Sequence, residues 1–231
     1  MKVVPPEQDP VAAVATLGEP LRRRIYDHAA SEAGGVSRDG VAEALALPRS
    51  VAAFHLDKLA QAGLLEVEYR RPPGRGGPGA GRPAKWYRRG GGEVTVSLPE
   101  RRYNLAASIL AEAVERAAGG EVPVATAVAE VARQHGRQIG STVRWGGGRS
   151  GTPARVLAQL LASYGYQPRV AGRQITLGNC PFHALAESHR ELVCGMNLEL
   201  LNGLLEAAGL PAGRARLDPS PDGCCVTLMT N

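Results

Sequence analysis

The sequence has few cysteines, few aromatic residues and no long apolar run. Four cysteines among 231 residues are too few for a disulfide scaffold, so we expect ligands, redox thiols or buried apolar residues. The apolar stretches, such as residues 109–111, are far shorter than the roughly 20 residues that cross a bilayer. The opening MKVVPPEQDP has no apolar signal core. We therefore expect a cytoplasmic protein with no membrane partner.

The sequence also lacks the patterns of common enzymes. It contains no Ser-His-Asp order and no paired carboxylates. The glycine-rich GRGGPGAGRP lacks the Lys-Ser/Thr that follows in a phosphate-binding loop. A thiol-redox enzyme is the remaining candidate, but the Cys-x-x-Cys spacing that such chemistry often uses is missing. We predict that the protein is not an enzyme.

Charge is nearly balanced overall but concentrated locally. The 27 basic and 22 acidic residues give a net charge of +5. The segment YRRPPGRGGPGAGRPAKWYRRGGG, residues 69–92, carries seven basic residues and no acid. Such an excess attracts polyanions, which indicates a nucleic-acid partner.

The first ninety residues predict three helices followed by a β-hairpin. Residues 9–34 have apolar residues at helical spacing, Ser37 is a candidate N-cap for a second helix, and residues 48–63 open with a proline and close with a glycine. Residues 64–71 then alternate apolar and polar, break into a Gly/Pro-rich tip and resume as AKWYRR. This order is the winged helix-turn-helix plan, in which the last helix enters the major groove and the wing follows the DNA backbone.

Two segments of this region, PRSVAAFHLDKLAQAGLLEVEYRR and GRPAKWYR, resemble the ArsR-like transcriptional regulators over roughly residues 10–95. We expect Val51, Phe54, Leu56 and Leu59 to be buried. Arginine can read guanine edges, serine and histidine can reach bases or phosphates, and lysine favours phosphate. The candidate DNA contacts are therefore Arg49, Ser50, Ala53, His55 and Lys58 in the helix and Arg75, Arg82 and Lys85 in the wing. For His55, packing or capping inside the domain is an equal alternative.

The remainder of the chain predicts a second domain. Helices are expected over residues 103–119, 122–144 and 153–165, with strand pairs around Ala171-Gly172 and around PSPDG at 219–223. The predicted class is α+β, with a winged helix-turn-helix domain in residues 1–98 and a helical, antiparallel-sheet sensor and dimerisation domain in residues 99–231. The helices of residues 104–140 could form a dimer interface or the domain's own core.

The segment NCPFHALAESHRELVCGMN, residues 179–197, contains two cysteines and two histidines. In a straight helix the fourteen residues from Cys180 to Cys194 would span about 21 Å, too far for sulfurs that each lie about 2.3 Å from one zinc ion. The capping-box pattern from Ser188 to Glu191 predicts a break and a new helix at His189. A third thiol could come from Cys224 or Cys225. Neighbouring residues on a strand point to opposite faces, so we expect only one of the two to join a site with Cys180 and Cys194.

The winged domain followed by NCPF, by VC and by a late cysteine resembles the SufR-like regulators of iron-sulfur-cluster assembly, over nearly the whole chain. That resemblance implies a homodimeric repressor of a double-stranded DNA operator. It further implies a 4Fe-4S cluster held by Cys180, Cys194 and Cys224, with His183 or an exogenous group as fourth ligand. Two alternatives stay open: a regulator that senses zinc or a small molecule, and cysteines that are only buried apolar residues.

Overall fold

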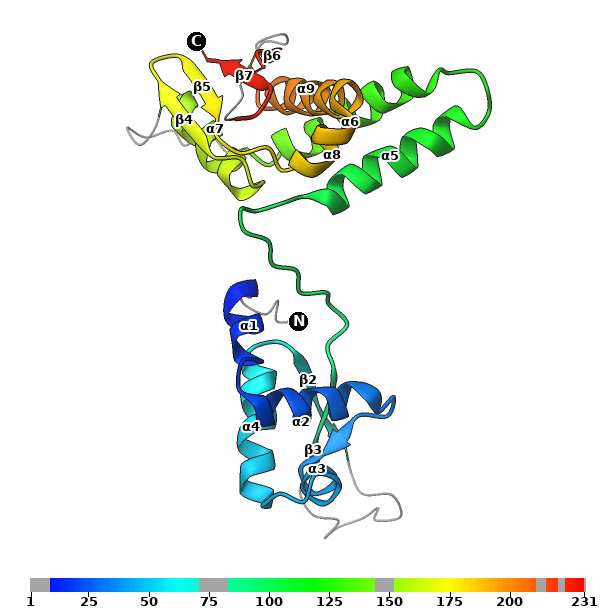
Figure 1. Ribbon diagram of the computed structural model, residues 1–231, viewed down its shortest axis with the longest axis vertical. Helices are drawn as coiled ribbons and strands as arrows, with labels where there is room; N and C mark the ends of the chain where they lie inside the picture. Colours follow the sequence, from blue (N-terminus) through cyan, green and yellow to red (C-terminus); the bar gives the residue numbers. More distant parts are fainter. Residues whose placement is uncertain (1–8, 71–82, 144–151, 211–214, 220–222, 231) are drawn as a thin grey trace. The chain divides into compact units, whose positions relative to one another are not determined.

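The computed structural model describes residues 9–70, 83–143, 152–210, 215–219 and 223–230. The chain forms two compact units, Met1–Val96 and Ser97–Asn231, each containing helices and an antiparallel sheet (Figure 1). The α+β class predicted from the sequence is confirmed. Two of the predicted wing contacts, Arg75 and Arg82, lie outside the described residues. None of the helices that the structure describes has the length and apolar character needed to cross a lipid bilayer.

The N-terminal unit has one more helix and one more strand than predicted. Its elements are α1 (Pro10–Thr16), α2 (Pro20–Ser31), β1 (Val36–Ser37), α3 (Arg38–Ala44), α4 (Arg49–Gln61), β2 (Leu65–Arg70) and β3 (Ala84–Arg89). The single helical region expected over 9–34 is divided, because Pro20 opens α2 and the Glu19 carboxylate caps the backbone N–H groups of Leu21 and Arg22. Ser37 caps α3 as predicted, accepting from the Gly40 N–H at 3.0 Å.

The sheet of this unit runs β1-β3-β2, with both pairs antiparallel. β1 has only two residues, too few to give an alternating signal, so the sequence predicted a two-stranded wing. Tyr87 of β3 is fully buried, and the core also contains Ile25, Leu56 and Leu59. This core joins α2, α4 and the wing strands β2 and β3 into one body.

The C-terminal unit contains α5 (Tyr103–Ala117), α6 (Val124–Gly140), α7 (Pro153–Ser163), β4 (Pro168–Ala171), β5 (Gln174–Leu177), α8 (His183–Ser188), α9 (Arg190–Ala207), β6 (Ala215–Leu217) and β7 (Val226–Met229). The sheet order is β4-β5-β7-β6, antiparallel throughout. Both predicted strand pairs are present, and pairing of β5 with β7 joins them. This pairing brings the segment after β5 close to the segment before β7.

Helices α6 and α9 pack with their backbones almost in contact. A Cβ atom on Gly136 or Gly140 of α6 would overlap the carbonyl oxygen of Leu200 or Leu204 in α9. Reciprocally, a Cβ on Gly203 would overlap the Arg133 carbonyl oxygen. Glycine at these positions allows the close approach, and α9 is thereby fixed in the core.

The predicted helix break after residue 188 is present, but the predicted capping box is wrong. α8 ends at Ser188, and His189 is the N-cap of α9 with no side-chain capping bond. His189 has φ −133° and ψ 50°, which is not helical. The chain therefore turns at His189, and Ser188 belongs to the helix before it.

Candidate nucleic-acid interface and cysteine site

The exposed face of α4 is formed by Arg49, Ser50, Phe54 and Lys58. Ser50, Phe54 and Lys58 follow each other at intervals of four residues, which puts them on one side of a helix. The expectation that Phe54 is buried is wrong, because its side chain is 54% exposed and Ala52 fills the core position instead. The four-residue spacing from Ser50 to Lys58 is the signal that could have identified Phe54.

His55 lies inside the N-terminal unit, as in the packing alternative. It is 9% exposed, and its Nδ1 atom lies 3.5 Å from Glu19 Oε2. Its neighbours Phe54 and Lys58 are on the exposed side of the same helix. His55 is thus separated from the surface that Ser50 and Lys58 occupy.

Asp57 connects α4 to the wing and to α3. Its carboxylate accepts hydrogen bonds from Tyr87 Oη at 2.8 Å, Lys85 Nζ at 3.0 Å and Arg38 Nη2 at 2.6 Å. Arg38 Nε also donates to Tyr87 Oη at 2.9 Å. Lys85, a predicted DNA contact, is therefore paired inside its own unit. The sequence analysis missed Asp57, since an acid in a helix expected to meet DNA is not by itself a signal of structural pairing.

This network changes the pKa values of its members. Burial alone would raise the pKa of Asp57, but hydrogen bonds from Tyr87 and Lys85 and the charge of Arg38 lower it below its ordinary 3.8. Burial, and then the hydrogen bond to Asp57, raise the pKa of Tyr87 to about 12. Asp57 is therefore ionised and Tyr87 neutral near pH 7, so the phenol donates to a charged acceptor.

The other basic residues near the wing are partly neutralised. Arg88 of β3 lies opposite Glu66 of β2 and pairs with it at 2.5 Å, and its Nε atom pairs with Glu68 at 2.7 Å. Arg70 also pairs with Glu68, at 2.8 Å. Segment 69–92 contains no acid, but the strand that precedes it supplies two. The basic excess is consequently smaller on the strands than the sequence indicated.

Arg49 stays at the surface, where its Nε atom meets Asp39 Oδ1 at 2.5 Å. Both side chains are more than 60% exposed, so solvent screens the pair and the guanidinium can exchange partners. A polar cleft runs beside it, lined by Ser37, Arg38, Asp39, Arg49, Tyr69, Pro83, Ala84 and Lys85. The start of α4 and the base of the wing thus present basic groups on one surface.

Residues 17–68 match a family model described as a helix-turn-helix domain. The N-terminal unit is a winged helix-turn-helix DNA-binding domain. The match supports a DNA-binding transcriptional regulator, and it includes no residue of the C-terminal unit. No curated protein and no solved structure matches the chain.

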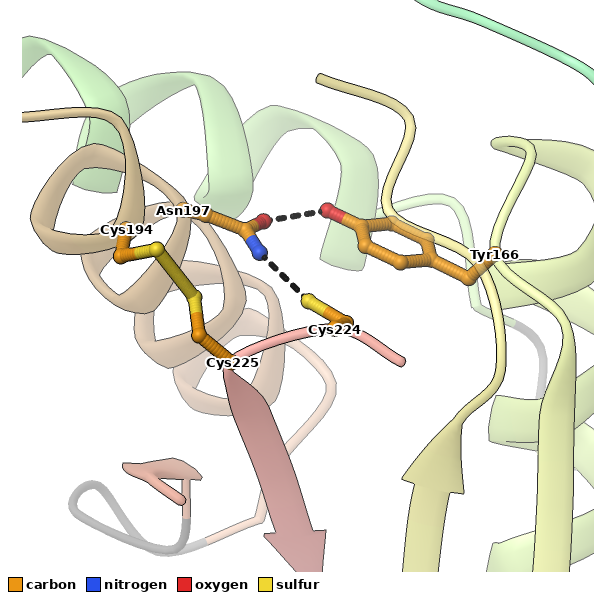
Figure 2. The surroundings of a disulfide bond; sticks show 5 residues. All are labelled: Tyr166, Cys194, Asn197, Cys224 and Cys225. Carbon is orange, nitrogen blue, oxygen red and sulfur yellow. Dashed lines mark hydrogen bonds between the residues drawn. A yellow bond between two sulfur atoms is a disulfide. The ribbon is translucent and has the colours of Figure 1, made fainter. Parts of the chain in front are cut away.

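The four cysteines lie together in the C-terminal unit, and we call this group the cysteine site. Cys180 follows β5, Cys194 is in the second turn of α9, and Cys224 and Cys225 precede β7. Cys194 and Cys225 form a disulfide with a Cα–Cα distance of 6.3 Å (Figure 2). Cys180 and Cys224 are free and buried, and each shifts the pKa of the other. The two residues of the Cys224-Cys225 doublet thus meet different partners.

The predicted ligands are divided between these two pairs. Cys180 meets Cys224, whereas Cys194 is bonded to Cys225. In the parts of the chain that the structure describes, no three His, Cys, Asp or Glu side chains are grouped as a metal site. His183, the candidate fourth ligand, is exposed and lies 3.3 Å from Glu187. His189 is also exposed.

The hydrogen-bonded thiols are electrostatically unequal. The hydrogen bond from Cys224 lowers the pKa of Cys180 to about 7 against the effect of burial, helped by the Phe182 N–H and the Arg101 charge. That bond to Cys180, together with burial, raises the pKa of Cys224. Cys180 is therefore the thiolate side of the pair and Cys224 the proton donor, and thiolates are the form that reacts and binds metals.

Asn197 of α9 lies at the centre of the site and is fully buried (Figure 2). Its Nδ2 atom donates to Cys224 Sγ at 3.1 Å, and its Oδ1 accepts from Tyr166 Oη at 2.6 Å. Burial, and then the charges at Cys224 and Cys180, raise the pKa of Tyr166 well above its ordinary value. Sequence reasoning missed both residues; an asparagine three positions after Cys194, among apolar residues, was the available signal.

Proposed function

We propose that the protein is a transcriptional repressor that binds operator DNA as a homodimer and responds to iron-sulfur or redox status at its cysteine site. One observation carries the proposal: a winged helix-turn-helix unit is joined to a second unit in which all four cysteines meet. Free cysteines are often merely buried. Here all four cysteines of the chain lie in one group, and two of them form a disulfide, which is more than core packing requires.

For DNA binding, the exposed face of α4 offers Arg49, Ser50 and Lys58 to base edges and phosphates. Phe54 adds an apolar surface that can contact a thymine methyl group. Arg75 and Arg82 are proposed to contact the DNA backbone from the wing. Lys85 acts chiefly through Asp57, holding β3 against α4.

For sensing, the donor set has the right chemistry, because iron-sulfur clusters bind to cysteine thiolates. Cys180, Cys194 and Cys224 would hold the 4Fe-4S cluster. As described, two pairs are present rather than a set of three ligands, so Cys194 must first be released from Cys225. When bound, the cluster would supply redox chemistry that is sensitive to oxidants. Asn197 orients Cys224, and Arg101 stabilises negative charge at Cys180.

A metal-free thiol switch is a second candidate, favoured by the disulfide between Cys194 and Cys225. Forming this bond removes two electrons and two protons from the two thiols, and hydrogen peroxide that accepts them is reduced to two molecules of water. The bond links α9 to the segment before β7, so its loss removes one of the contacts that hold that segment. In this version the other two cysteines stay reduced.

A small-molecule sensor would need a binding cavity in the C-terminal unit. The apolar cavity between Leu105, Tyr166 and Phe182 has a volume of about 10 Å³, roughly the space for one water molecule. An effector would have to open it.

The dimer is proposed because winged regulators bind half-sites about one helical turn apart. Of the helices considered for the interface, α5 buries Ala106, Ile109 and Ala113 and α6 buries Val131 in the unit's own core. The exposed side of α5 still presents Val114, at 59% exposure. We assign the interface to that outer side.

Anaerobic purification tests the sensing proposal. The visible absorption spectrum, with iron and sulfide counts, should reveal a cluster in the wild type. The cluster should be lost in Cys180→Ser, Cys194→Ser and Cys224→Ser but kept in Cys225→Ser. A colourless, iron-free wild type that still changes its DNA affinity with a thiol reductant would instead select the metal-free switch. A colourless protein with no such response would overturn both versions.

A further inference from the structure

The loop that carries Cys180 is bonded to the start of the C-terminal unit. We call residues 178–182 the cysteine loop and residues 97–102 the linker segment, since the chain continues from it into the DNA-binding unit. Arg101 Nη1 donates to Asn179 Oδ1 at 2.5 Å and to the Cys180 carbonyl oxygen at 2.8 Å. The Arg102 N–H donates to the Pro181 carbonyl oxygen at 3.0 Å. Three successive residues of the loop thus bind two successive residues of the linker segment.

Asn179 completes this set of contacts from within the core. It is 8% exposed, and its Nδ2 atom donates to the Glu100 carbonyl oxygen at 3.1 Å and to the Gly165 carbonyl oxygen at 2.5 Å. Its amide therefore bonds the linker segment through both its oxygen and its nitrogen. These three hydrogen bonds hold the buried amide in one orientation, so displacement of Asn179 breaks several bonds at once.

The opposite side of the cysteine loop is held by the cysteine site. The Cys224 N–H donates to the Leu177 carbonyl oxygen at 2.8 Å, just before the loop, and the Cys224 thiol is near enough to Cys180 to shift its pKa. The next residue, Cys225, is fixed to α9 by the disulfide. Ligation or oxidation of Cys180 or Cys224 would alter their contact directly, and a change at Cys225 would act on it through the adjacent Cys224. Cys180 is adjacent in sequence to Asn179.

We propose that Arg101 and Asn179 are positioning residues that transmit the state of the cysteine site to the linker segment, and through it to the DNA-binding unit. The inference rests on the proposed function and identifies the contacts that would couple the cysteine site to the DNA-binding unit. Coupling between two sites requires an element whose arrangement differs between their states. The cysteine loop is placed to be such an element, because its two sides contact the cysteine site and the linker segment. A merely structural contact would instead stay the same in every thiol state.

Hydrogen exchange of the full-length protein tests the route without DNA. In the wild type, reduction of the disulfide under a metal chelator should speed exchange of the peptide covering residues 97–105 by about fivefold or more. Cys194→Ser/Cys225→Ser should reproduce the fast rate without reductant. In Arg101→Ala the peptide should exchange fast in both thiol states. Equal rates in the two states of the wild type would overturn the proposal.

DNA affinity supplies the second readout. The probe is a duplex selected from random sequence by the wild type, and the quantity is the ratio of Kd values between reduced and disulfide forms. Coupled regulators typically show ratios of roughly 5 to 150. Arg101→Ala, which removes both bonds, should lower the ratio to about 2 or less while one state keeps the wild-type Kd.

Arg102→Ala is the matched control. It removes the same charge from the neighbouring position, but its side chain bonds Ser163 and Glu100 rather than the cysteine loop, and its N–H bond to Pro181 remains. It should keep the wild-type ratio. A wild-type ratio that is large and unchanged in Arg101→Ala would overturn the route alone. A wild-type ratio of one, in both thiol and cluster states, would overturn the proposed function and the route with it.

Discussion

Asp57 in α4 accepts a 2.8 Å hydrogen bond from the phenol of Tyr87 in β3. The bond connects the helix that faces DNA to the wing, from the ionised form of one residue to the neutral form of the other. Hydrogen bonds to charged groups contribute about 1.5–3 kcal/mol. The angle between helix and wing is consequently set by a polar network as well as by the apolar core.

Replacing Asp57 should therefore loosen the N-terminal unit. Asp57→Asn keeps the shape of the side chain but removes the charge that three donors share. We expect the free energy of unfolding to fall by about 1–2 kcal/mol. This is less than the full value for a hydrogen bond to a charged group, because the carboxylate is partly exposed. Chemical denaturation would measure it. Asp39→Asn, at the 71% exposed partner of Arg49, should cost less than about 0.5 kcal/mol. Equal losses in the two variants would contradict the special role of Asp57.

The same network predicts a pH dependence. Because the folded protein lowers the pKa of Asp57, the stabilisation is present above the ordinary value of 3.8 and is lost as the pH falls through the lower folded value. Denaturation of wild type and Asp57→Asn from about pH 7 to about pH 2 should give a constant difference that shrinks only below 3.8. A difference already fading near neutral pH would argue against this assignment.

Lys58 and Lys85 should differ in their effect on DNA binding. Lys58 is exposed on α4, whereas Lys85 is paired with Asp57. If Lys58 neutralises one phosphate, Lys58→Ala lowers the slope of log K against log salt by about 0.9. Lys85→Ala should change the slope less and lower stability more. Fluorescence anisotropy of a labelled duplex at several salt concentrations would measure the slope for each variant. A larger change of slope in Lys85→Ala than in Lys58→Ala would mean that Lys85, and not Lys58, contacts phosphate.

Much of the N-terminal unit followed from the sequence because its signals are local. The Ser37 cap, the proline before α4 and the alternating strand from residue 65 each involve neighbours along the chain. Phe54 and Asp57 could not be assigned in this way. Whether Phe54 or Ala52 enters the core depends on how α4 is rotated against α2, and the bonds of Asp57 come from residues 19 to 30 positions away.

Close packing of α6 and α9 should make their glycines intolerant of substitution. Gly136→Ala places a methyl group against the Leu200 carbonyl oxygen, and backbone atoms of a core helix cannot move away cheaply, so we expect a loss of about 3 kcal/mol or more. Gly195→Ala in α9 meets nothing within 4 Å. It should be neutral or stabilising by about 0.5–1 kcal/mol, because alanine favours helix. Thermal unfolding of the two variants would show whether they differ as predicted.

Asn197 should matter more than its neighbour Asn202 in the same helix. Asn197→Ala leaves the Tyr166 hydroxyl and the Cys224 thiol without their partner in a buried site, at a cost of about 1–3 kcal/mol. The Oδ1 atom of Asn202 is buried without a hydrogen-bond partner, so Asn202→Ala should cost less. Denaturant unfolding under reducing conditions gives both values. The reverse order would mean that the Tyr166–Asn197–Cys224 chain does not hold the site together.

For the cysteine site, the sequence indicated the members but not their pairing. A break between Cys180 and Cys194 could be foreseen, since a straight helix would hold them apart. The division of Cys224 and Cys225 between two partners could not, because both precede β7 and lie outside the strand alternation on which the prediction depended. The same holds for the residues around the cysteines. Contacts between segments far apart in the sequence bring Tyr166, Asn179 and Arg101 to the site, and no local sequence pattern predicts such contacts.

The central claim is that the state of the cysteine site controls DNA affinity. It is tested most directly by the Kd of the full-length protein for its selected duplex, measured at one salt concentration in the cluster-bound, reduced cluster-free and disulfide states. We predict that at least two states differ by roughly fivefold or more, and that Cys180→Ser removes the difference. Identical Kd values in all three states, from protein that binds the duplex tightly, would contradict the account.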